Sequence, residues 1–377
     1  MESATLIIGG DLAPTKSNYS YFEAGNINEL IDDRLLSLLE TADYRIFNLE
    51  LPLTDIEKPI KKDGPNLMAP ISALKGIKLL NPTVLSLANN HILDHDEHGM
   101  YQTIDLLSKS NISWVGAGKD LHTAAKPIII KRGDLRIGIY ACAEYEFSIA
   151  EENKAGANPF DPLESPDHVA DLKSRCDYVV VLYHGGKELY RYPSPYLQKV
   201  CRKIAEKGAD LIICQHSHCI GAFEKYNGSV IVYGQGNFLF DMTDKGICKT
   251  SLLIKVTFGD NMSVDFLPFC KKRTGIALPE SDVSRSILKD FNERSNNLSL
   301  PGFIETEYEK FCISRGLFYI GAIAGLGRIP RKLNELLHGI ITRQIYSLKK
   351  LNSLQNMIEC EAHRELILRY LRIIRKR

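Results

Sequence analysis

The first two thirds of the chain alternate short apolar runs with longer stretches in which apolar residues recur at the helical period. Helices are predicted over residues 27–40, 99–110 and 195–207. Strands are predicted at ten apolar runs: 5–8, 45–48, 84–88, 114–116, 127–130, 136–141, 178–183, 210–214, 230–233 and 251–258. Alternating strands and helices are typical of a layered α/β domain, and runs that are apolar throughout indicate a sheet covered on both faces. Closely spaced strands after residue 127 suggest a second, antiparallel sheet.

The pattern changes between residues 278 and 301, where the chain is polar and rich in Asn and Ser. This segment predicts a linker with a short helix, so we expect one domain over 1–278 and a mainly helical extension over 279–377. Residues 331–377 contain 11 Lys and Arg against 4 Asp and Glu. Two interpretations fit this extension: a helical bundle with its basic side in water, or a basic amphipathic surface that contacts membrane lipid or an anionic polymer.

The composition is that of a soluble globular protein, with 377 residues, 44% hydrophobic and 25% charged. A net charge of +1 and a single Trp do not indicate a nucleic-acid partner, and none is expected. None of the nine Cys forms a CxxC pair, and most lie in apolar runs, so we expect buried free thiols in a reducing cytosol. No apolar run approaches the roughly 18 residues of a membrane helix. The expected location is cytoplasmic, with a peripheral position at the inner face of the membrane as an extension of this prediction.

Five segments place polar side chains directly after predicted strands, and a hydrolytic metal site needs ligands that converge from the ends of several strands. The first is Asp11, which follows two glycines. The second contains Asn48 and Glu50, which alternate with apolar residues and therefore face the same way. Taken singly, Asp11 also fits a turn or a helix cap, and Glu50 also fits a solvated strand edge.

The third segment is the triplet Asn89, Asn90 and His91, which follows a strand and precedes a helix. A turn without any ligand role is the alternative interpretation of the triplet. His95 and His98 lie beyond it, and we expect both at the surface.

The fourth and fifth segments supply imidazoles. His184 closes an apolar strand and is followed by two glycines, and Glu188 lies four residues on, where it could bind metal, orient a ligand or contact substrate. His216 and His218 are two residues apart, so on an extended segment both rings point to one side. Cys214 precedes them and fits either a soft ligand or, more simply, the last core residue of its strand.

In chain order, the segments GGD, NLE, ANNHILD, YHGGKE, QHSH and YGQGNF resemble the CapA family of poly-gamma-glutamate capsule biosynthesis proteins. This family belongs to the calcineurin-like, metallo-dependent phosphatase superfamily, and the resemblance covers roughly residues 4–270. It implies an α/β fold, a four-layer α/β/β/α sandwich with metals at one sheet edge, to which this chain adds a C-terminal helical extension.

The resemblance also implies roles for individual residues. It assigns six ligands for one or two divalent ions (Mn, Fe, Zn or Mg): Asp11 and His218 for one ion, Asn90, His184 and His216 for the other, and Glu50 as the bridge. His91 would protonate a leaving group or stabilise developing negative charge, with Glu188 as a second catalytic candidate. Asn89 and Asn237 are the candidate substrate contacts. The GQGNF segment that contains Asn237 also fits a tight loop that only packs Phe238.

Two positions depart from the phosphoesterase pattern: Ala13 stands where a His is usual, and Glu50 stands where an Asp is usual. We expect a metal-dependent hydrolase of phosphoester or amide bonds in capsule or surface-polymer biosynthesis. Its substrate would be an anionic polymer or a small phosphorylated or peptide-like molecule. The alternative is a non-hydrolytic assembly or polymer-binding protein that supports a ligase, with the basic C-terminal helices at the membrane or at a capsule synthase.

Overall fold

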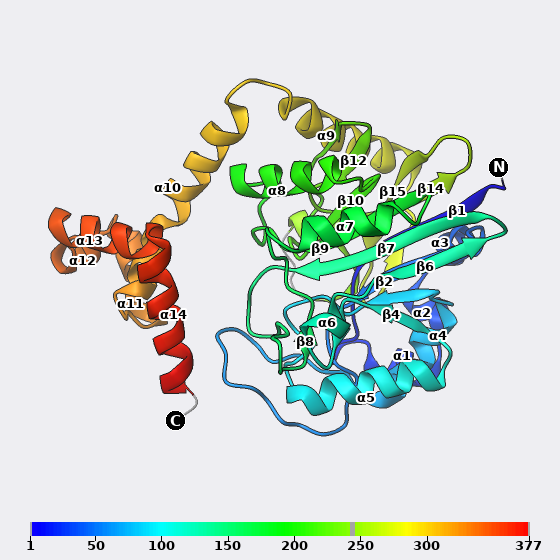
Figure 1. The fold of residues 1–377 in the computed structure, drawn as a ribbon, viewed down its shortest axis with the longest axis horizontal. Helices are drawn as coiled ribbons and strands as arrows, with labels where there is room; N and C mark the ends of the chain where they lie inside the picture. The colour runs from blue at the N-terminus through cyan, green and yellow to red at the C-terminus, as the bar shows by residue number, and fades with distance from the viewer. Residues whose placement is uncertain (1, 242–245, 376–377) are drawn as a thin grey trace. The chain divides into compact units, whose positions relative to one another are not determined.

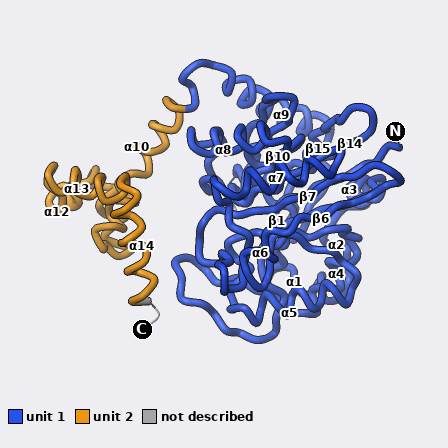
Figure 2. Tube along the Cα trace, viewed as in Figure 1, with its two compact units in different colours: residues 1–304 blue, residues 305–377 orange. Residues whose placement is uncertain are grey.

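The computed structural model describes residues 2–241 and 246–375 (Figure 1). The chain forms two compact units, residues 1–304 and residues 305–377 (Figure 2). All residues singled out above as candidate site residues lie in the first unit, so its sheets and helices are what position the site.

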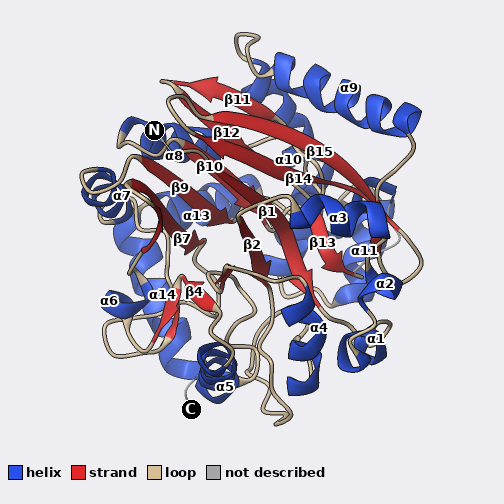
Figure 3. Ribbon diagram, turned by 90° about the vertical axis from the view of Figure 1, so that its right-hand side faces the viewer, coloured by secondary structure: helices blue, strands red, loops and turns tan. Residues whose placement is uncertain are grey.

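The first sheet of this unit follows the order β16 (Ile276–Ala277), β15 (Ser263–Lys271), β14 (Thr250–Phe258), β1 (Ala4–Ala13), β2 (Tyr44–Leu49), β3 (Val84–Ser86) and β4 (Ser113–Val115). An eighth strand, β13 (Asn237–Phe240), also pairs with β1. The strands β1, β2, β3, β4 and β13 pair in parallel, and β14, β15 and β16 are antiparallel to their neighbours. Figure 3 shows β1, β14 and β15 side by side.

The second sheet follows the order β11 (Phe223–Tyr226), β12 (Ser229–Val232), β10 (Leu211–Gln215), β9 (Tyr178–His184), β7 (Leu135–Ala143) and β6 (Ile128–Arg132). Its four inner strands are parallel, and only the edge pairs β6–β7 and β11–β12 are antiparallel. The expectation of an antiparallel second sheet is therefore wrong. Helical crossovers join β7 to β9 and β9 to β10, and such crossovers are what parallel neighbours require. A separate short pair consists of β5 (Ala117–Gly118) and β8 (Gly156–Ala157).

The helices of this unit are α1 (Tyr19–Ala24), α2 (Ile27–Leu30), α3 (Asp33–Glu40), α4 (Leu74–Leu79), α5 (Asp96–Lys109), α6 (Leu121–Ala124), α7 (Ser165–Lys173), α8 (Pro195–Glu206) and α9 (Ser281–Asn297), with 3₁₀ turns at Ile71–Ala73 and Gly246–Cys248. The helix predicted over 27–40 is divided into α2 and α3. The division falls at Ile31, which is extended and pairs with Ile276 of β16. The other two predicted helices correspond to α5 and α8.

Three apolar cores separate the layers of the first unit. Leu6 and Ile8 of β1 pack in a core shared by the two sheets, whereas Ile7 between them packs against the helices α1–α5. This alternation follows from the two-residue period of a strand. A third core lies between the second sheet and the helices α7 and α8. The order is helices, sheet, sheet, helices (Figure 1), which confirms the predicted four-layer sandwich.

Helix α9 lies in the segment expected to be a linker, yet it packs on the first unit. Phe291 is fully buried, and its ring lies 5.1 Å from that of Phe223 and 4.9 Å from that of Phe266. The backbone N–H of Phe223 donates to Ser295 Oγ at 2.9 Å. Because of these contacts, the compact unit continues to Ile304, past the boundary expected at residue 278.

The second unit is helical, with α10 (Phe303–Ile323) leading into α11 (Arg328–Leu336), α12 (Ile340–Ile345), α13 (Leu348–Glu359) and α14 (Glu361–Arg375). Many of its large apolar side chains are exposed, among them Ile313, Ile329, Leu336 and Leu348. Within residues 2–241 and 246–375, no helix combines the length and the apolar character needed to cross a membrane.

Candidate metal centre

The carboxyl ends of β1, β2, β9 and β10 bring the candidate ligands together. Asp11 of β1 lies beside Asn48 of β2 and beside Asn237 of β13. His184 ends β9 opposite Gln215, the last residue of β10. Parallel strands end at one edge of a sheet, so polar residues placed after them converge there. The residues predicted from five separate segments thus meet in one buried site.

Glu50 lies at the centre of this site. It directly follows β2, it has no exposed surface, and neither of its carboxylate oxygens has a hydrogen-bond partner. Its Oε1 lies 3.5 Å from His184 Nε2. Burial, followed by the negative charge of Asp11, raises the pKa of Glu50 well above its ordinary value. A buried carboxylate without donors is costly, and a cation between Glu50 and its neighbours would remove that cost.

Two groups of potential ligand atoms share Glu50. One consists of Asp11, Glu50 and His218, the other of Glu50, His184 and His216, and within each group the atoms lie within 4.8 Å of one another. Imidazole nitrogens mixed with carboxylate oxygens suit divalent transition metals. By donor chemistry and by the two unpartnered oxygens of Glu50, the residues present fit a divalent metal site.

His216 and His218 reach this site on an unusual backbone. Their φ angles are +78° and +56°, in the left-handed region that residues other than Gly rarely adopt and that is enriched at functional sites. The sequence argument assumed an extended segment. The two rings do lie on one side, with centroids 5.7 Å apart, but the reason is this left-handed conformation. His216 Nδ1 is buried and has no partner.

The electrostatics favour ligand protonation states in most of the site. Burial lowers the pKa of His184 to about 3 and that of His216 well below its ordinary value, so both rings are neutral. Burial alone would raise the pKa of Asp11, but its hydrogen bond with His218 and the nearby His184 outweigh that and lower it. Burial alone would lower the pKa of His218, but Asp11 outweighs that and raises it. Metal binding requires neutral imidazoles and ionised carboxylates, so His218 and the shared Glu50, whose pKa values are both raised, are the ligands that would have to release a proton.

Side-chain amides hold the ligands in place. Asn48 Nδ2 donates to Asp11 Oδ1 at 2.8 Å and lies 3.2 Å from His184 Nδ1. Asn90 Oδ1 lies 3.0 Å from His184 Nε2, so Asn90 stands beside the second group of ligands as predicted. Asn89 is fully buried: its amide donates to Asn48 Oδ1 and to Leu49 O, at 3.1 and 2.9 Å. These contacts position the loop, and a direct contact between Asn89 and substrate stays a prediction.

His91 is held by two residues that the sequence argument did not single out. Its Nδ1 lies 2.5 Å from Asp94 Oδ2, and Lys62 contacts both His91 Nδ1, at 3.2 Å, and Asp94. Asp94 is fully buried and also accepts from Leu67 N at 2.6 Å. The spacing of three residues between His91 and Asp94 was a usable signal. Lys62 lies in a long loop whose sequence has no helical or strand period, so no signal pointed to it.

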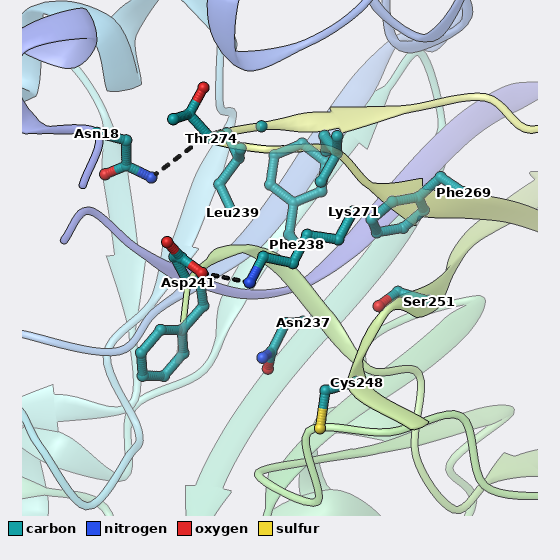
Figure 4. Close-up of a pocket in the computed structure, with 13 residues that line it drawn as sticks. Asn18, Asn237, Phe238, Leu239, Asp241, Cys248, Ser251, Phe269, Lys271 and Thr274 are labelled. Atoms are coloured by element: carbon teal, nitrogen blue, oxygen red, sulfur yellow. Dashed lines mark hydrogen bonds and ion pairs between the residues drawn. The ribbon is translucent and has the colours of Figure 1, made fainter. Parts of the chain in front are cut away.

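Asn237 and Glu188 both lie close to the centre. Asn237 Oδ1 lies 2.8 Å from His218 Nδ1, at the end of the pocket drawn in Figure 4, where the ion pair between Lys271 and Asp241 also lies. Glu188 is half-buried in the loop after β9. Burial and Asp11 are the largest causes of the raised pKa of Glu50, and the charge of Glu188 raises it further. Glu188 therefore lies close to the ligands.

The GQGNF segment is both a tight loop and part of the site. Phe238 is buried with its ring 4.7 Å from that of Phe47. Gly236 has φ +82°, and its carbonyl oxygen would lie 1.9 Å from a Cβ placed on Gly10, so the two backbones touch. This close approach sets Asn237 next to His218.

The surroundings of Ala13, which stands where the phosphoesterase pattern has a His, are apolar. Ala13 lies beside Phe240 of β13, and the Phe240 ring is 5.5 Å from that of His218. Cys214 does not replace the lost ligand, because its Sγ lies 3.6 Å from Cys201 Sγ in the core beneath α8. The group around Asp11 and His218 therefore has fewer donors than the group around His184 and His216.

The sequence itself places the protein among its relatives. Residues 5–242 match the family described as bacterial capsule synthesis protein PGA_cap. The chain belongs to this family. The matched segment of PGA_cap contains every candidate ligand discussed here, and it confirms the resemblance drawn from the motifs.

Two relatives illustrate the family. The PGA biosynthesis protein CapA of Bacillus subtilis (strain 168) is 32% identical over 209 residues, which cover 54% of this chain and 55% of that protein. The capsule biosynthesis protein CapA of Bacillus anthracis is 29% identical over 270 residues, which cover 67% of this chain and 65% of that protein. The chain thus spans between half and two thirds of the length of these relatives. Among solved structures, a phosphatase from Mycoplasma pneumoniae is similar with a TM-score of 0.44 and 14% identity, covering 72% of this chain and 94% of that one.

Proposed function

We propose that this PGA_cap protein is a metal-dependent hydrolase that acts in the biosynthesis of a bacterial capsule or another surface polymer. The observation that carries the proposal is Glu50, a fully buried carboxylate without hydrogen bonds that is shared by two groups of potential ligands. The proposed role in capsule biosynthesis is inferred from the names of the relatives. The proposed hydrolytic reaction is inferred from the arrangement of the site.

In this proposal the site would divide its ligands between two divalent ions. Asp11 and His218 would hold one ion, Asn90, His184 and His216 would hold the other, and Glu50 would serve both. Bound divalent ions would supply Lewis acidity and lower the pKa of a water nucleophile. Mn, Fe, Zn and Mg all suit ligands of this mixture.

His91 is the proposed general acid. Its Nδ1 is engaged by Asp94 and Lys62, which fixes the ring and leaves Nε2 for the substrate. A carboxylate behind an imidazole orients the ring, so Asp94 is a positioning residue for the acid. The bond cleaved is a phosphoester or an amide, in a polymer or in a small peptide-like or phosphorylated molecule.

The first test is metal content followed by turnover. Purified protein should contain a divalent metal by elemental analysis and should bind Mn²⁺ by calorimetry. The variant His184→Ala should lose this affinity by at least tenfold, because His184 belongs to the better supplied group of ligands. The variant His168→Ala, which alters a histidine near Tyr140 outside the site, is the matched control. Protein that binds no metal and hydrolyses neither phosphodiesters nor peptide-like substrates after Mn²⁺ addition would refute the proposal.

A second candidate, a non-hydrolytic assembly protein at the membrane surface, is favoured by α14. Its apolar residues Leu366, Ile367, Tyr370 and Leu371 are exposed, and arginines recur among them at positions 364, 369 and 372. A basic amphipathic helix of this kind suits an anionic lipid surface. The protein should then sediment with vesicles that contain anionic lipid and not with neutral vesicles, and a chain ending at Ile304 should lose this binding. Equal recovery with both vesicle types would exclude the contact.

The proposed location is the inner face of the membrane. The nine free cysteines suit the reducing compartment on that side.

A further inference from the structure

Glu146 lies next to the metal centre although no sequence motif pointed to it. It follows β7 in the connection to β8, and its side chain is 41% exposed. Its Oε2 accepts from Asn90 Nδ2 at 3.3 Å, and its Oε1 lies 4.0 Å from His216 Nε2. The two carboxylate oxygens thus face one ligand each, Asn90 and His216, and the partly exposed group stands at the solvent side of the site.

The first consequence concerns the orientation of Asn90. An ionised carboxylate can only accept hydrogen bonds, so Glu146 requires the amide nitrogen of Asn90 on its own side. The amide oxygen then points the other way, toward His184 Nε2 at 3.0 Å. This is the orientation in which Asn90 offers an oxygen to a metal ion.

The second consequence concerns charge at the mouth. Glu144 precedes Glu146 by two residues. Burial raises the pKa of Glu144, hydrogen bonds lower it, and the negative charge of Glu146 raises it further, so that the pKa is raised on balance. The two carboxylates therefore interact. Glu188 acts on Glu50 and on His218, so it lies near these two ligands. The cation closest to His91, Lys62, is paired with Asp94, and Lys187 acts on Glu144. Glu146 adds a negative charge directly beside Asn90 and His216.

We propose that Glu146 is a specificity-determining residue: it holds Asn90 in its metal-binding orientation and places a negative charge that favours substrates with an ammonium group beside the scissile bond. The same charge disfavours phosphate dianions, so the site would select an amide with a neighbouring amine over a phosphomonoester. This inference rests on the proposed metal-dependent function and narrows its substrate class.

Three probes separate the effects of charge and of metal binding. Glycine hydroxamate and acetohydroxamate share the metal-binding group, but only the former carries an ammonium group, and inorganic phosphate carries the opposite charge. Calorimetry on the Mn²⁺-loaded protein would give the affinity of each probe. The variants are Glu146→Gln, which removes the charge but can still accept from Asn90, Glu146→Ala, which removes both, and Glu152→Gln, which removes an exposed charge on the same connection.

The expected result is a change in ratios. The preference for glycine hydroxamate over acetohydroxamate should fall about fivefold in Glu146→Gln, and phosphate should bind about fivefold more tightly, as suits a partly exposed charge. Affinity for Mn²⁺ should fall only modestly in that variant, because the lost charge also attracts the cation, and should fall further, about tenfold, in Glu146→Ala. Glu152→Gln should match the unaltered protein. Unchanged ratios in Glu146→Gln with normal Mn²⁺ binding would overturn the inference alone. An unaltered protein that does not bind Mn²⁺ would instead overturn the proposed function on which it rests.

Discussion

Replacement of Glu50 with Gln is expected to stabilise the metal-free protein and to abolish its stabilisation by divalent ions. Glu50 has no exposed surface and no hydrogen-bond donor. Burial, then Asp11, raises its pKa well above the ordinary value, so as pH rises the metal-free folded state keeps this proton to a higher pH than the unfolded state does. Gln has nearly the same shape and no charge to lose.

The magnitude follows from linkage. A carboxyl that stays protonated in the folded state costs about 1.4 kcal/mol for each pH unit above its unfolded pKa of about 4.3. At pH 7.5 the upper bound is therefore about 4 kcal/mol. The folded pKa is the higher one, so the stability of the metal-free protein falls as pH rises from about 4.3 through the folded pKa. The advantage of Glu50→Gln should grow over the same window.

Metal acts in the opposite direction. An ion at 1,000 times its Kd stabilises the folded state by about 4 kcal/mol, and for a domain of this size each kcal/mol is about 2–4 °C in Tm. Thermal unfolding with EDTA and with Mn²⁺, at pH 5.5 and 7.5, would measure both effects. Glu40→Gln, which alters an exposed acid at the end of α3, is the control. A Glu50→Gln variant that is less stable without metal and still gains stability from Mn²⁺ would refute the reasoning.

Three further outcomes are expected. Asp43 Oδ2 accepts from Thr5 N and Oγ1, both at 2.8 Å; burial opposes these bonds but they prevail and lower its pKa. Because Asp43 is exposed and its contacts are screened by solvent, Asp43→Asn should cost about 0.5–1 kcal/mol at pH 7, and in urea titrations the difference should shrink as pH falls from about 4 through the lowered folded pKa. A chain that ends at residue 278 should lose about 3–5 kcal/mol because the contacts of Phe291 are removed, whereas one that ends at residue 304 should keep its urea midpoint. Asn48→Ala, which frees Asp11 and His184 from their amide partner, should weaken Mn²⁺ binding by about 10–100-fold in calorimetry, and an unchanged affinity would show that these hydrogen bonds do not orient the ligands.

The candidate ligands could be picked out from sequence because they stand at or near the end of an apolar strand. Asp11 lies near the end of β1, Glu50 follows β2 and His184 ends β9. Parallel strands bring such ends to one edge of a sheet, and the packing of the two sheets on each other brings the two edges together. The pattern also predicted a covered sheet, since strands apolar on both faces must be covered on both faces. The four-layer order was implied by the resemblance to the CapA family.

Other features depend on contacts between segments that are distant in sequence. Lys62 and Glu146 come from irregular connections, where no period relates a residue to its neighbours in space. The pairing of β13 with β1 joins residues more than 220 positions apart and brings Phe240 to His218. The parallel order of the second sheet depends on how α7 and α8 cross it. Polarity in the segment of α9 suggested a linker, although two buried residues, Phe291 and Ser295, hold the helix to the sheets.

The unequal supply of ligands has one physical origin, the strand pair β1–β13. Ala13 on β1 stands beside Phe240 on β13, so an apolar ring occupies the surroundings in which a related phosphoesterase would place an imidazole. The same pairing sets Asn237 Oδ1 at 2.8 Å from His218 Nδ1, and Asp11 raises the pKa of His218 against the effect of burial. A metal ion in this half would therefore have to displace a proton and bind with one ligand fewer. In the other half His184 and His216 are already neutral, so the ion held by His184, His216, Asn90 and Glu50 should be the tighter of the two.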